Sequence, residues 1–600
     1  MSLQFITGNS GNGKTEYLFN RIVKEAKENP RDNYLVIVPE QFTMQTQRQL
    51  VDLSENKVIM NIDVLSFKRL AYRVFDELGI TNLTVLEETG KNLVLRKLAA
   101  QEADKLGVIG RNLNRIGYIS EVKSLLSELV QYNISPEELG RYIASGRLSD
   151  TLSDKLKDVL VLYEAFEKFM QDKYITAEEI LNVLSNVAEE SAILRNSVIA
   201  FDEFTGFTPI QNQLIKKLFV ISKKIYVTLT IDCREDIFKS RGMQELFDMP
   251  KRTVKSLTEM AAFYGIEVEE PIILDKNYRL AENEELSFME QQLFRKRRCS
   301  FKKAPKHIHI DCLRDPKQEL TKIARRINEL VRNENLRYRD IAIVTGDVNI
   351  YAGYVREIFD KYNIPYFIDA TQEILFHPFI EFIRSIPDIA AQNFSADAVF
   401  RFLRCGFSEL LDSEIDVLEN YVLACGVRGK SAWDKKWVRL PKHKAGYDLE
   451  LLNQSREYIM ELLKPVYQVF SDKKSTVKDY VLAIYKLIVL LDIPDKLAKK
   501  EQALLDAGDQ TASKEYGQIY KIVMQLFEKY VAVLGDECMD TEEFTQILDA
   551  GLDAADVAVI PPGYDTVTIG DIERTRLTNI KVMFFAGVND GIVPKAAGRG

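Results

Sequence analysis

The feature that most constrains the fold is an octapeptide at residues 8–15, which reads GNSGNGKT and matches the pattern GxxxxGK(S/T). The apolar stretch LQFITG precedes it, and EYLFNRIVKEAKE follows with apolar residues at helical spacing. In this setting glycines let backbone N–H groups surround phosphate oxygens, and the helix N-terminus adds positive potential. The order strand, loop, helix therefore predicts an α/β domain that binds a nucleotide. The alternative, a glycine-rich turn that matches by chance, does not explain both flanking elements.

The motif and one later segment assign roles to individual residues. Lys14 would pair with the β- and γ-phosphates of ATP, and Thr15 would ligate Mg²⁺. Such a site also needs an acidic residue at the end of a hydrophobic strand, which SVIAF followed by Asp202 and Glu203 supplies. Asp202 would organise the magnesium ion and Glu203 would polarise the attacking water, although acidic pairs at strand ends are also ordinary in α/β proteins. The expected nucleotide contacts are Gly8, Asn9, Ser10, Gly11, Asn12, Gly13, Lys14 and Thr15, and the expected magnesium ligands are Thr15 and Asp202.

Composition limits the class of protein. The 600 residues exceed a single hydrophobic core, and at about 150 residues per domain they predict roughly four domains. The net charge is 80 − 89 = −9, so contact with DNA requires a local basic track. The sequence opens without a basic and apolar leader and contains no run of ~20 apolar residues, so we expect a cytoplasmic protein with no membrane partner. Its six cysteines are scattered without a CxxC pair, which predicts neither a disulfide framework nor an iron–sulfur site in this chain.

Unbroken apolar runs, typical of buried parallel strands, alternate along the chain with long amphipathic helical patterns. The segment HIHIDCL (307–313) alternates in polarity and predicts a further strand, with His307 and His309 on one face. The pattern as a whole predicts an α/β fold of two sheet domains, each interrupted by a mainly helical insertion. The expected boundaries are 1–85 and 191–290 for the first sheet domain with its insertion at 86–190, and 291–380 and 546–600 for the second with its insertion at 381–545.

Six further segments follow the phosphate-binding loop in the order seen in superfamily 1 helicases, and SFxRLAxR, DxFTGFTP and GVNDGxxP are the most distinctive patterns among them. Together they resemble the B subunits of AddAB-type helicase–nucleases, bacterial machines that resect double-strand breaks and respond to Chi sequences. The resemblance extends over essentially all 600 residues. The six segments are VPEQFTMQTQ (38–47), VLSFKRLAYRV (64–74), FDEFTGFTP (201–209), DIAIVTGD (340–347), YNIPYFID (362–369) and KVMFFAGVNDGIVPK (581–595).

This resemblance implies two P-loop, RecA-like helicase domains in tandem, called 1A and 2A in the family, with helical insertions 1B and 2B. It implies a heterodimer with an AddA-type motor and nuclease subunit, acting on single- and double-stranded DNA in recombinational repair. B subunits of the family end in an exonuclease domain with a 4Fe–4S cluster held by four cysteines. Because that cysteine spacing does not occur here, we expect the nuclease and its cluster in a C-terminal half that this chain lacks.

Several motifs of an active superfamily 1 helicase motor are altered in this sequence. Phe204 and Thr205 follow the acidic pair where a motor carries Gln-Asp, LTIDCRED contains no glutamine, and no arginine follows DIAIVTG. TIGDIERTRLTNI replaces the motif TxHxxKGLE, although Arg574 or Arg576 would substitute for one missing group. We therefore expect ATP binding without ATP-driven translocation. The alternatives are an active superfamily 1 helicase, a structural partner subunit that reads no sequence, and a P-loop small-molecule phosphotransferase.

The family is thought to read DNA with this helicase-like scaffold, and motif positions transfer the reading residues to this chain. Gln and Arg side chains make bidentate contacts with base edges, and Phe and Tyr rings stack on single-stranded bases for ~1–3 kcal/mol each. Phe67 and Phe207 have apolar neighbours, so a place in the hydrophobic core is the alternative for both. The expected DNA- and Chi-contacting residues are Gln41, Thr43, Phe67, Arg69, Tyr72 and Phe207.

A basic stretch lies between the two expected sheet domains. It would either follow a DNA backbone through salt-dependent phosphate contacts or form a solvated linker. The charge pattern favours neither over the other. Its residues are Arg295, Lys296, Arg297, Arg298, Lys302 and Lys303.

Overall fold

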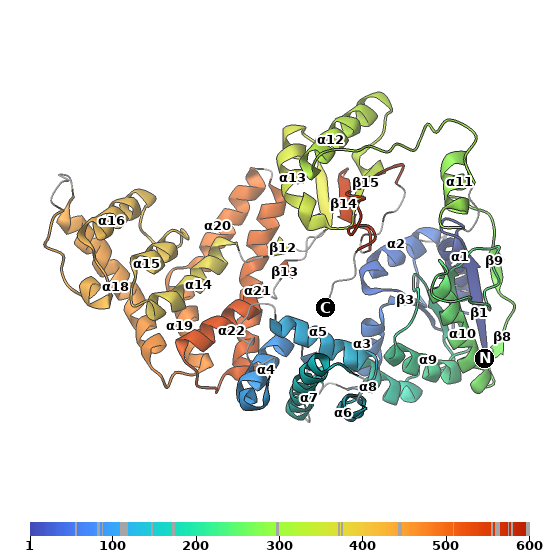
Figure 1. Cartoon of the computed structure of the whole chain (residues 1–600), viewed down its shortest axis with the longest axis horizontal. Helices are drawn as coiled ribbons and strands as arrows, with labels where there is room; N and C mark the ends of the chain where they lie inside the picture. The colour runs from blue at the N-terminus through green and yellow to red at the C-terminus, as the bar shows by residue number, and fades with distance from the viewer. Residues whose placement is uncertain are drawn as a thin grey trace. The chain divides into compact units, whose positions relative to one another are not determined.

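The computed structural model divides the chain into two compact units. The first comprises residues 1–87 and 124–312, and the second comprises 88–123 and 313–600. Figure 1 shows the elements of both units, coloured along the chain. The structure describes residues 1–595 with the exception of 55–56, 81–84, 87, 108–117, 146–147, 171–173, 296–298, 370–371, 374–375, 442–446, 508, 554–555, 558–564, 574, 576 and 578–579.

Among its described residues, the first unit contains a sheet of seven parallel strands in the order β3-β2-β6-β7-β1-β8, with β9 also paired to β1. The strands β1 and β7 pair from Ser2 opposite Lys224 to Gly8 opposite Thr230. The central strands are apolar along their length because both faces of the sheet are covered. The strands are β1 (Ser2–Gly8), β2 (Tyr34–Ile37), β3 (Ile62–Leu65), β6 (Val198–Phe201), β7 (Lys224–Thr230), β8 (Glu267–Val268) and β9 (Ile272–Leu274).

Local sequence signals fix the ends of several helices in this unit. The Ser66 hydroxyl caps the start of α3, and Gly79, with φ at 69°, ends it. Thr208 and Gln211 form a capping box at the start of α9. The helices are α1 (Lys14–Glu28), η1 (Glu40–Phe42), α2 (Thr43–Leu53), α3 (Phe67–Leu78), α6 (Pro136–Ala144), α7 (Asp150–Met170), α8 (Ile180–Val187), α9 (Pro209–Ile221), α10 (Asp248–Phe263) and α11 (Glu284–Gln292), and α5 (Tyr118–Gln131) crosses the boundary between the units.

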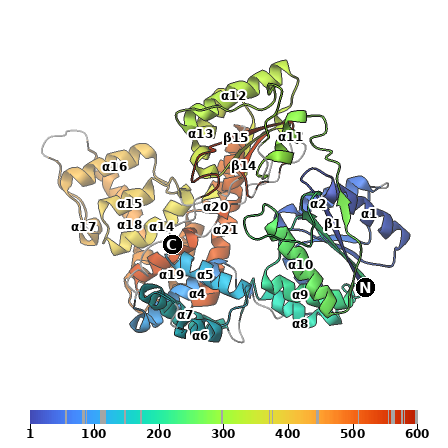
Figure 2. The same cartoon turned by 45° about the vertical axis from the view of Figure 1, so that its right-hand side comes forward.

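Two hydrophobic clusters cover the two faces of the first sheet. On one face, Leu18 of α1 and Leu50 of α2 pack with Ile6 and Val36. On the other face, α3, α8, α9 and α10 contribute the apolar side chains that pack against Phe5 and its neighbours. Figure 2 shows α1 and α2 on one side of the strands and α9 and α10 on the other. The carboxyl ends of the parallel strands therefore meet at a single edge that the covering helices leave accessible.

The second unit contains a smaller parallel sheet, with β11-β14-β10-β15 as its order among the described residues. The strands β10 and β14 pair side by side although more than 200 residues of sequence separate them. The helices α12 (Pro316–Asn333) and α13 (Val348–Lys361) contribute to the core of this sheet. The strands are β10 (Ile341–Thr345), β11 (Tyr366–Asp369), β14 (Val567–Asp571) and β15 (Val582–Ala586), and the short pairs elsewhere are β4 (Val85–Leu86) with β5 (Ile175–Thr176) and β12 (Gln372–Glu373) with β13 (Asp556–Val557).

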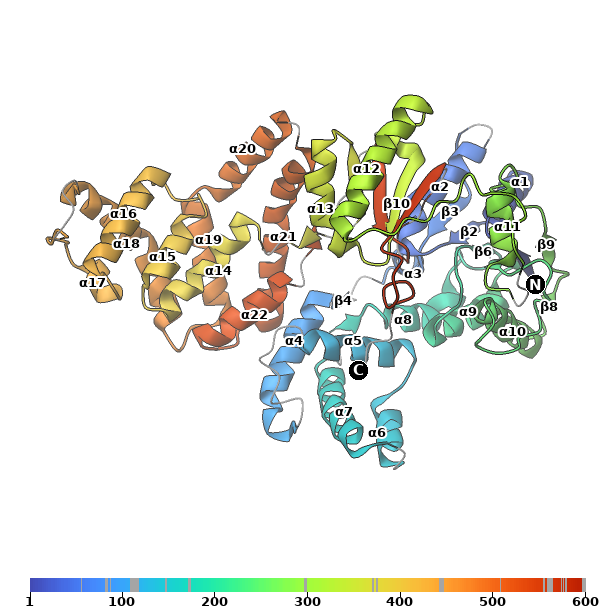
Figure 3. The same cartoon turned by 45° about the horizontal axis from the view of Figure 1, so that its top comes forward.

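A large helical region lies between β12 and β13 in the sequence and shares one hydrophobic core, visible in Figure 3. Leu93 of α4 joins this core, and the Arg96 guanidinium donates hydrogen bonds to the backbone and side chain of Gln546. Residues 88–101 therefore fold with helices that lie more than 400 residues later in the sequence. The helices are α4 (Glu88–Gln101), α14 (Pro378–Ala391), α15 (Ala396–Leu403), α16 (Asp412–Cys425), α17 (Lys430–Asp434), α18 (Leu449–Ser471), α19 (Val477–Leu490), α20 (Ile493–Asp506), α21 (Gln510–Leu534) and α22 (Thr541–Asp553).

The α/β class with parallel sheets is confirmed, whereas the tandem RecA-like arrangement and the domain boundaries stay predictions. The strand predicted at residues 307–313 is wrong, because that segment has no strand conformation and Ile310 is 95% exposed. Alternating polarity makes a strand only where a neighbouring strand accepts its backbone hydrogen bonds and a surface covers its apolar face. In the part of the chain that the structure describes, no helix has both the length and the apolar character needed to cross a membrane.

Candidate functional site

The predicted site residues of the first unit lie at the carboxyl edge of its sheet. The phosphate-binding loop follows β1, Asp202 and Glu203 follow β6, and the segments with Gln41 and Phe67 follow β2 and β3. Because all these strands are parallel, their carboxyl ends share one edge. The fold thus brings together segments that are separated by up to about 190 residues in sequence.

The loop at residues 8–13 has the backbone shape that phosphate binding requires. Gly11 and Gly13 adopt left-handed conformations with φ at 87° and 77°, which cost little only for glycine. Gly13 directly precedes α1, so the first N–H groups of that helix face the loop. The Asn12 side chain ties the loop to the sheet by donating a 2.6 Å hydrogen bond to the Leu274 carbonyl. This arrangement is a preformed cradle for an anion.

The Lys14 ammonium lies in the centre of the cradle. It donates a 2.9 Å hydrogen bond to the Asn9 carbonyl within the same loop. Burial lowers the pKa of Lys14, while the Asp202 and Glu203 carboxylates act to raise it and Arg279 acts to lower it. A bound phosphate would replace the carbonyl as the partner of this ammonium and would favour its charged form.

Oxygen atoms from three elements converge beside Lys14. The Thr15 hydroxyl oxygen lies 3.3 Å from an Asp202 carboxylate oxygen and 3.4 Å from a Glu203 carboxylate oxygen. Asp202 is 1% exposed and also accepts a short hydrogen bond from the Thr228 hydroxyl of β7. Hydroxyl and carboxylate oxygens are the ligands that magnesium prefers, so Thr15 and Asp202 fit a magnesium ion bound with a triphosphate.

Glu203 has an unusual backbone. Its φ is 66°, a left-handed conformation that is uncommon outside glycine. Such strained residues cluster at functional sites because the surrounding structure must hold them. The exposed Glu203 carboxylate lies 3.4 Å from the Thr15 hydroxyl.

A segment that no sequence motif predicted covers the phosphate-binding loop. The backbone N–H groups of Tyr278 and Arg279 donate to the Gly11 carbonyl, and the Asn277 side chain donates to the Ser10 carbonyl at 3.0 Å. The Arg279 guanidinium lies 3.5 Å from the Ser10 hydroxyl, and the Tyr278 ring lies beside Gly13, where a Cβ atom on this glycine would be 3.5 Å from the ring. A signal was present in the sequence, because a polar DKNYR run follows the apolar segment that forms β9. Only the pairing of β9 with β1 reveals that these residues reach the loop.

The side chain of Asn9 connects the loop to two other elements. Its carbonyl oxygen accepts from the Cys233 N–H at 3.0 Å, and its amide donates to the Glu290 carboxylate of α11 at 2.7 Å. Glu290 and Cys233 were also missed, since neither belongs to a recognisable motif. The conformation of the phosphate-binding loop therefore depends on α11 and on the segment after β7, which comprises residues 231–247.

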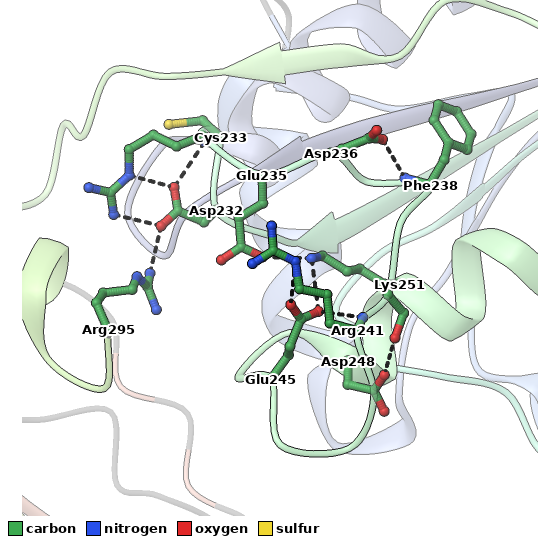
Figure 4. Close-up of polar contacts among 12 residues, drawn as sticks. Asp232, Cys233, Glu235, Asp236, Phe238, Arg241, Glu245, Asp248, Lys251 and Arg295 are labelled. Carbon is green, nitrogen blue, oxygen red and sulfur yellow. Dashed lines mark hydrogen bonds and ion pairs between the residues drawn. The ribbon is translucent and has the colours of Figure 1, made fainter. Parts of the chain in front are cut away.

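Ion pairs hold the segment after β7 in place, as Figure 4 shows. The Asp232 carboxylate, 2% exposed, pairs with Arg234 at 2.6 Å and with Arg295 at 2.7 Å. Lys251, on α10, pairs with Glu235 at 2.7 Å and with Glu245 at 3.2 Å. Burial acts to raise the pKa of Asp232, but the hydrogen bonds and charge of Arg234, with the charge of Arg295, lower it to about 2. The Asp232, Glu235 and Glu245 carboxylates are thus each paired with a basic side chain.

The predicted reading residues differ in their exposure. Gln41 in η1 and Arg69 and Tyr72 on α3 have exposed side chains. The Thr43 side chain is buried and donates to the Glu40 carbonyl at 3.0 Å, which gives it a local structural role. Phe67 is 7% exposed, so it does not offer an open stacking face in this conformation.

The two predicted phenylalanines belong to one aromatic cluster. Phe67 lies 5.8 Å from Phe201, 5.6 Å from Phe204 and 6.3 Å from Phe207, measured between ring centroids. Phe207 is only partly buried and sits in the loop between β6 and α9. The cluster connects β6, which Asp202 follows, with the helix that exposes Arg69 and Tyr72.

The basic stretch is partly outside the described residues. Lys296, Arg297 and Arg298 lie there, as do Arg574 and Arg576, so the structure places none of them. The described Arg295 pairs with Asp232, and Lys303 pairs with Glu284 at 2.5 Å. Arg295 is therefore an anchor for the segment after β7, and its guanidinium also stacks over the Phe247 ring at 5.0 Å.

Similarity to known proteins agrees with this geometry. Residues 5–290 match the family described as "ADDB, N-terminal". The chain is 40% identical to the B subunit of the ATP-dependent helicase/deoxyribonuclease of Lachnoclostridium phytofermentans, over 99% of this chain and 53% of the relative. Proteins of the same name from Clostridium acetobutylicum and Clostridium novyi are each 32% identical, over 100% and 99% of this chain and 52% of each relative. The chain thus spans about half the length of the curated relatives it matches, and it belongs to the family of ATP-dependent helicase/deoxyribonuclease B subunits, AddB.

Proposed function

We propose that this chain is a helicase-like scaffold that binds ATP with Mg²⁺, guides single-stranded DNA and reads Chi, without translocating on DNA itself. The observation that carries the proposal is a contrast at one sheet edge. The phosphate-binding loop, Thr15 and Asp202 carry the groups that ATP with Mg²⁺ would need, whereas the carboxylates of the neighbouring segment after β7 are held in ion pairs. A translocating motor needs groups in such a segment that sense the γ-phosphate and move with it.

Nucleotide binding is supported by three sets of groups. The N–H groups of the loop and of the first turn of α1 surround the phosphates, and Lys14 and Arg279 add positive charge. The exposed Tyr278 ring, which lies beside Gly13, offers a face to the nucleotide. A magnesium ion supplies charge neutralisation when bound, and Thr15 and Asp202 are the residues that would hold it.

Sequence reading is assigned to the exposed side chains at the same edge. Gln41 and Arg69 carry the planar donor groups that recognise base edges, and Tyr72, 39% exposed, carries a stacking face. Phe67 and Phe207 support this surface from the aromatic cluster beneath it. The two roles share one edge, so the strand that is read passes close to the nucleotide.

The name of the relatives, which describes the B subunit of an ATP-dependent helicase/deoxyribonuclease, supports a wider proposal. The complete protein would act as a heterodimer with an AddA-type motor subunit, in the cytoplasm, on the ends of double-strand breaks. The two α/β units of this chain would be tandem RecA-like domains with helical insertions. The exonuclease activity and its 4Fe–4S cluster would belong to the part of the relatives that does not align with this chain.

An ATPase assay on the chain tests the first part of the proposal. We expect binding of ATP with Mg²⁺ but little stimulation of hydrolysis by single-stranded DNA. A strong stimulation that Lys14→Ala abolishes would contradict the proposal and favour an active superfamily 1 helicase.

Selection of oligonucleotides from a random single-stranded pool tests the reading. We expect the chain to enrich one sequence, and Gln41→Ala or Arg69→Ala to erase the enrichment while total DNA binding remains. Arg73→Ala is the matched control on α3, because its guanidinium lies 3.9 Å from the Asp63 carboxylate and pairs with it. Enrichment that survives both reading variants would leave only a structural role.

A further inference from the structure

The first unit contains a pocket of about 570 Å³ beside the loop that carries Phe207. Its walls come from the turn after α5, the first turns of α9 and the last turns of α10. The helices α9 and α10 lie side by side in Figures 1 to 3. A volume of this size lies in the range of small-molecule sites. Neither the nucleotide site nor the reading surface includes this pocket.

Exposed aromatic rings form part of the pocket wall. Phe263 is 82% exposed and Tyr132 is 59% exposed, which is a large apolar area to leave in water. The Tyr264 ring supports Phe263 in an edge-to-face contact with centroids 5.0 Å apart. Phe263, supported by Tyr264, and Tyr132 offer faces on which a flat ligand can stack.

Polar groups complete the pocket. Asn133, Asn212 and Gln213 contribute carboxamides, which both donate and accept hydrogen bonds in one plane. Lys216 is exposed, and among the described residues no carboxylate forms an ion pair with it. The carboxylate of Glu259 is directed to Lys255, with 3.9 Å between the charged atoms. The pocket therefore offers hydrogen bonding for a neutral planar group and one cation for an adjacent anion.

A direct hydrogen bond joins the pocket to the proposed reading surface. The Asn212 amide donates to the Phe207 carbonyl at 3.4 Å. Pro209, which lines the pocket, begins α9 two residues after Phe207. The wall of the pocket therefore adjoins the loop that carries Phe207.

We propose that this pocket binds one unstacked base of single-stranded DNA, adjacent to the bases read at Gln41, Arg69 and Tyr72. The inference rests on the proposed reading of single-stranded DNA and adds a further subsite to it. The base stacks on Tyr132 and Phe263, the carboxamides bond to its edge, and the Lys216 ammonium contacts the neighbouring phosphate. Planar shape, mixed donors and acceptors and an attached anion are the properties of a nucleotide in a single strand.

Binding of a short fluorescent oligonucleotide to the whole 600-residue chain tests the proposal, with anisotropy as the readout. We expect Phe263→Ala and Tyr132→Ala each to weaken binding about 5- to 100-fold, the effect of one lost stacking contact. We expect Lys216→Gln to reduce the slope of log affinity against log salt by about 0.7. The matched controls are Phe238→Ala and Tyr142→Ala, which remove exposed aromatic rings of the same unit outside the pocket, 48% and 53% exposed. Both controls should bind like the unchanged chain.

Photo-cross-linking adds a readout that does not depend on affinity. With 5-iododeoxyuridine at successive positions, we expect one position to cross-link to residues 256–264 or to Tyr132. If both pocket variants bind like the controls while Arg69→Ala weakens binding, the subsite is wrong and the proposed function stands. If the unchanged chain does not bind the oligonucleotide, both proposals fail. If the pocket variants bind DNA normally but lose a protein partner, the pocket is a protein-docking site and the inference is overturned.

Discussion

The carboxyl edges of the two parallel sheets are built in different ways. At the first edge, left-handed Gly11 and Gly13 open a loop of N–H groups, and charged side chains surround it. At the second edge, the residues that follow β10 and β15 pack against other parts of the same unit. A Cβ atom on Gly346 would lie 2.8 Å from the Ile592 carbonyl oxygen, and one on Gly587 would lie 2.6 Å from the Tyr351 hydroxyl. Charged side chains therefore surround the predicted nucleotide site at the first edge, whereas close packing of backbone and side chains fills the second.

This difference fits the proposal of a helicase-like scaffold that binds a nucleotide without motor function. Rapid nucleotide hydrolysis in such motors depends on a positively charged group that stabilises the transition state. In this chain the loop after β15 packs over the end of β10, and the Thr575 hydroxyl bonds to Asp369 at 2.7 Å. Removal of a charged side chain should therefore reduce stability or nucleotide binding most at the first edge. An added side-chain atom should reduce stability most at the second edge.

The largest effect should follow loss of the Asp232 carboxylate. In Asp232→Ala the Arg295 guanidinium, 16% exposed, loses its partner, and a buried charge without a partner is costly. We expect the free energy of unfolding of the first unit to fall by about 3 kcal/mol, measured by urea denaturation. Asp236→Ala is the control in the same loop, because the Asp236–Lys239 pair is exposed and should contribute little. Equal losses for the two variants would mean that burial of the pair does not decide its contribution.

The same carboxylate predicts a dependence on pH. Because the pKa of Asp232 is lowered to about 2 from an ordinary value of 3.8, its contribution is complete above pH 3.8 and is lost as the pH falls through 2. The expected contribution is about 2 kcal/mol. Unfolding of the unchanged chain and of Asp232→Asn should be compared across this range. A slope in the variant as steep as in the unchanged chain would assign the acid sensitivity to other groups.

The sequence was sufficient for the parts of the site that depend on short-range order. The loop at residues 8–15 and the acidic pair after β6 are each recognisable from a short motif at the end of one strand. The structure brings Thr15 and Asp202 within 3.3 Å of each other. The segment with Tyr278 and Arg279 was not predictable in this way. Its position depends on the pairing of β9 with β1, a contact between residues about 265 apart in sequence.

Two other features show the same limit. The strand predicted at 307–313 fails because alternation does not supply a pairing partner, and the described strands leave Ile310 exposed. The conformation of the segment after β7 depends on ion pairs with Arg295 and Lys251. These two residues belong to no motif and reach the segment only through tertiary contacts. Sequence patterns thus predict secondary-structure elements and local motifs. The ion pairs that hold the segment after β7 can be identified only from the three-dimensional structure.

At the nucleotide site, Lys14→Ala should weaken ATP binding about 10- to 100-fold, because one charge-assisted hydrogen bond to phosphate is lost. Titration with a fluorescent ATP analogue measures this change. Lys24→Ala, an exposed lysine on the same helix, should bind like the unchanged chain. Nucleotide affinity that is unaffected by Lys14→Ala would mean that the first edge is not the nucleotide site, and the comparison of the two edges would lose its basis.

At the second edge, Gly346→Ala should destabilise the second unit by about 1–2 kcal/mol, because its Cβ atom must displace backbone of the loop after β15. Gly353→Ala is the matched control, since a Cβ there meets no atom within 4 Å and the residue lies inside α13. This control should raise stability by up to about 1 kcal/mol, because alanine favours a helix more than glycine does. Thermal unfolding of the two variants therefore gives shifts of opposite sign. Shifts of the same sign would mean that the loop after β15 moves to accommodate the added atom at little cost. The second edge would then not be tightly packed.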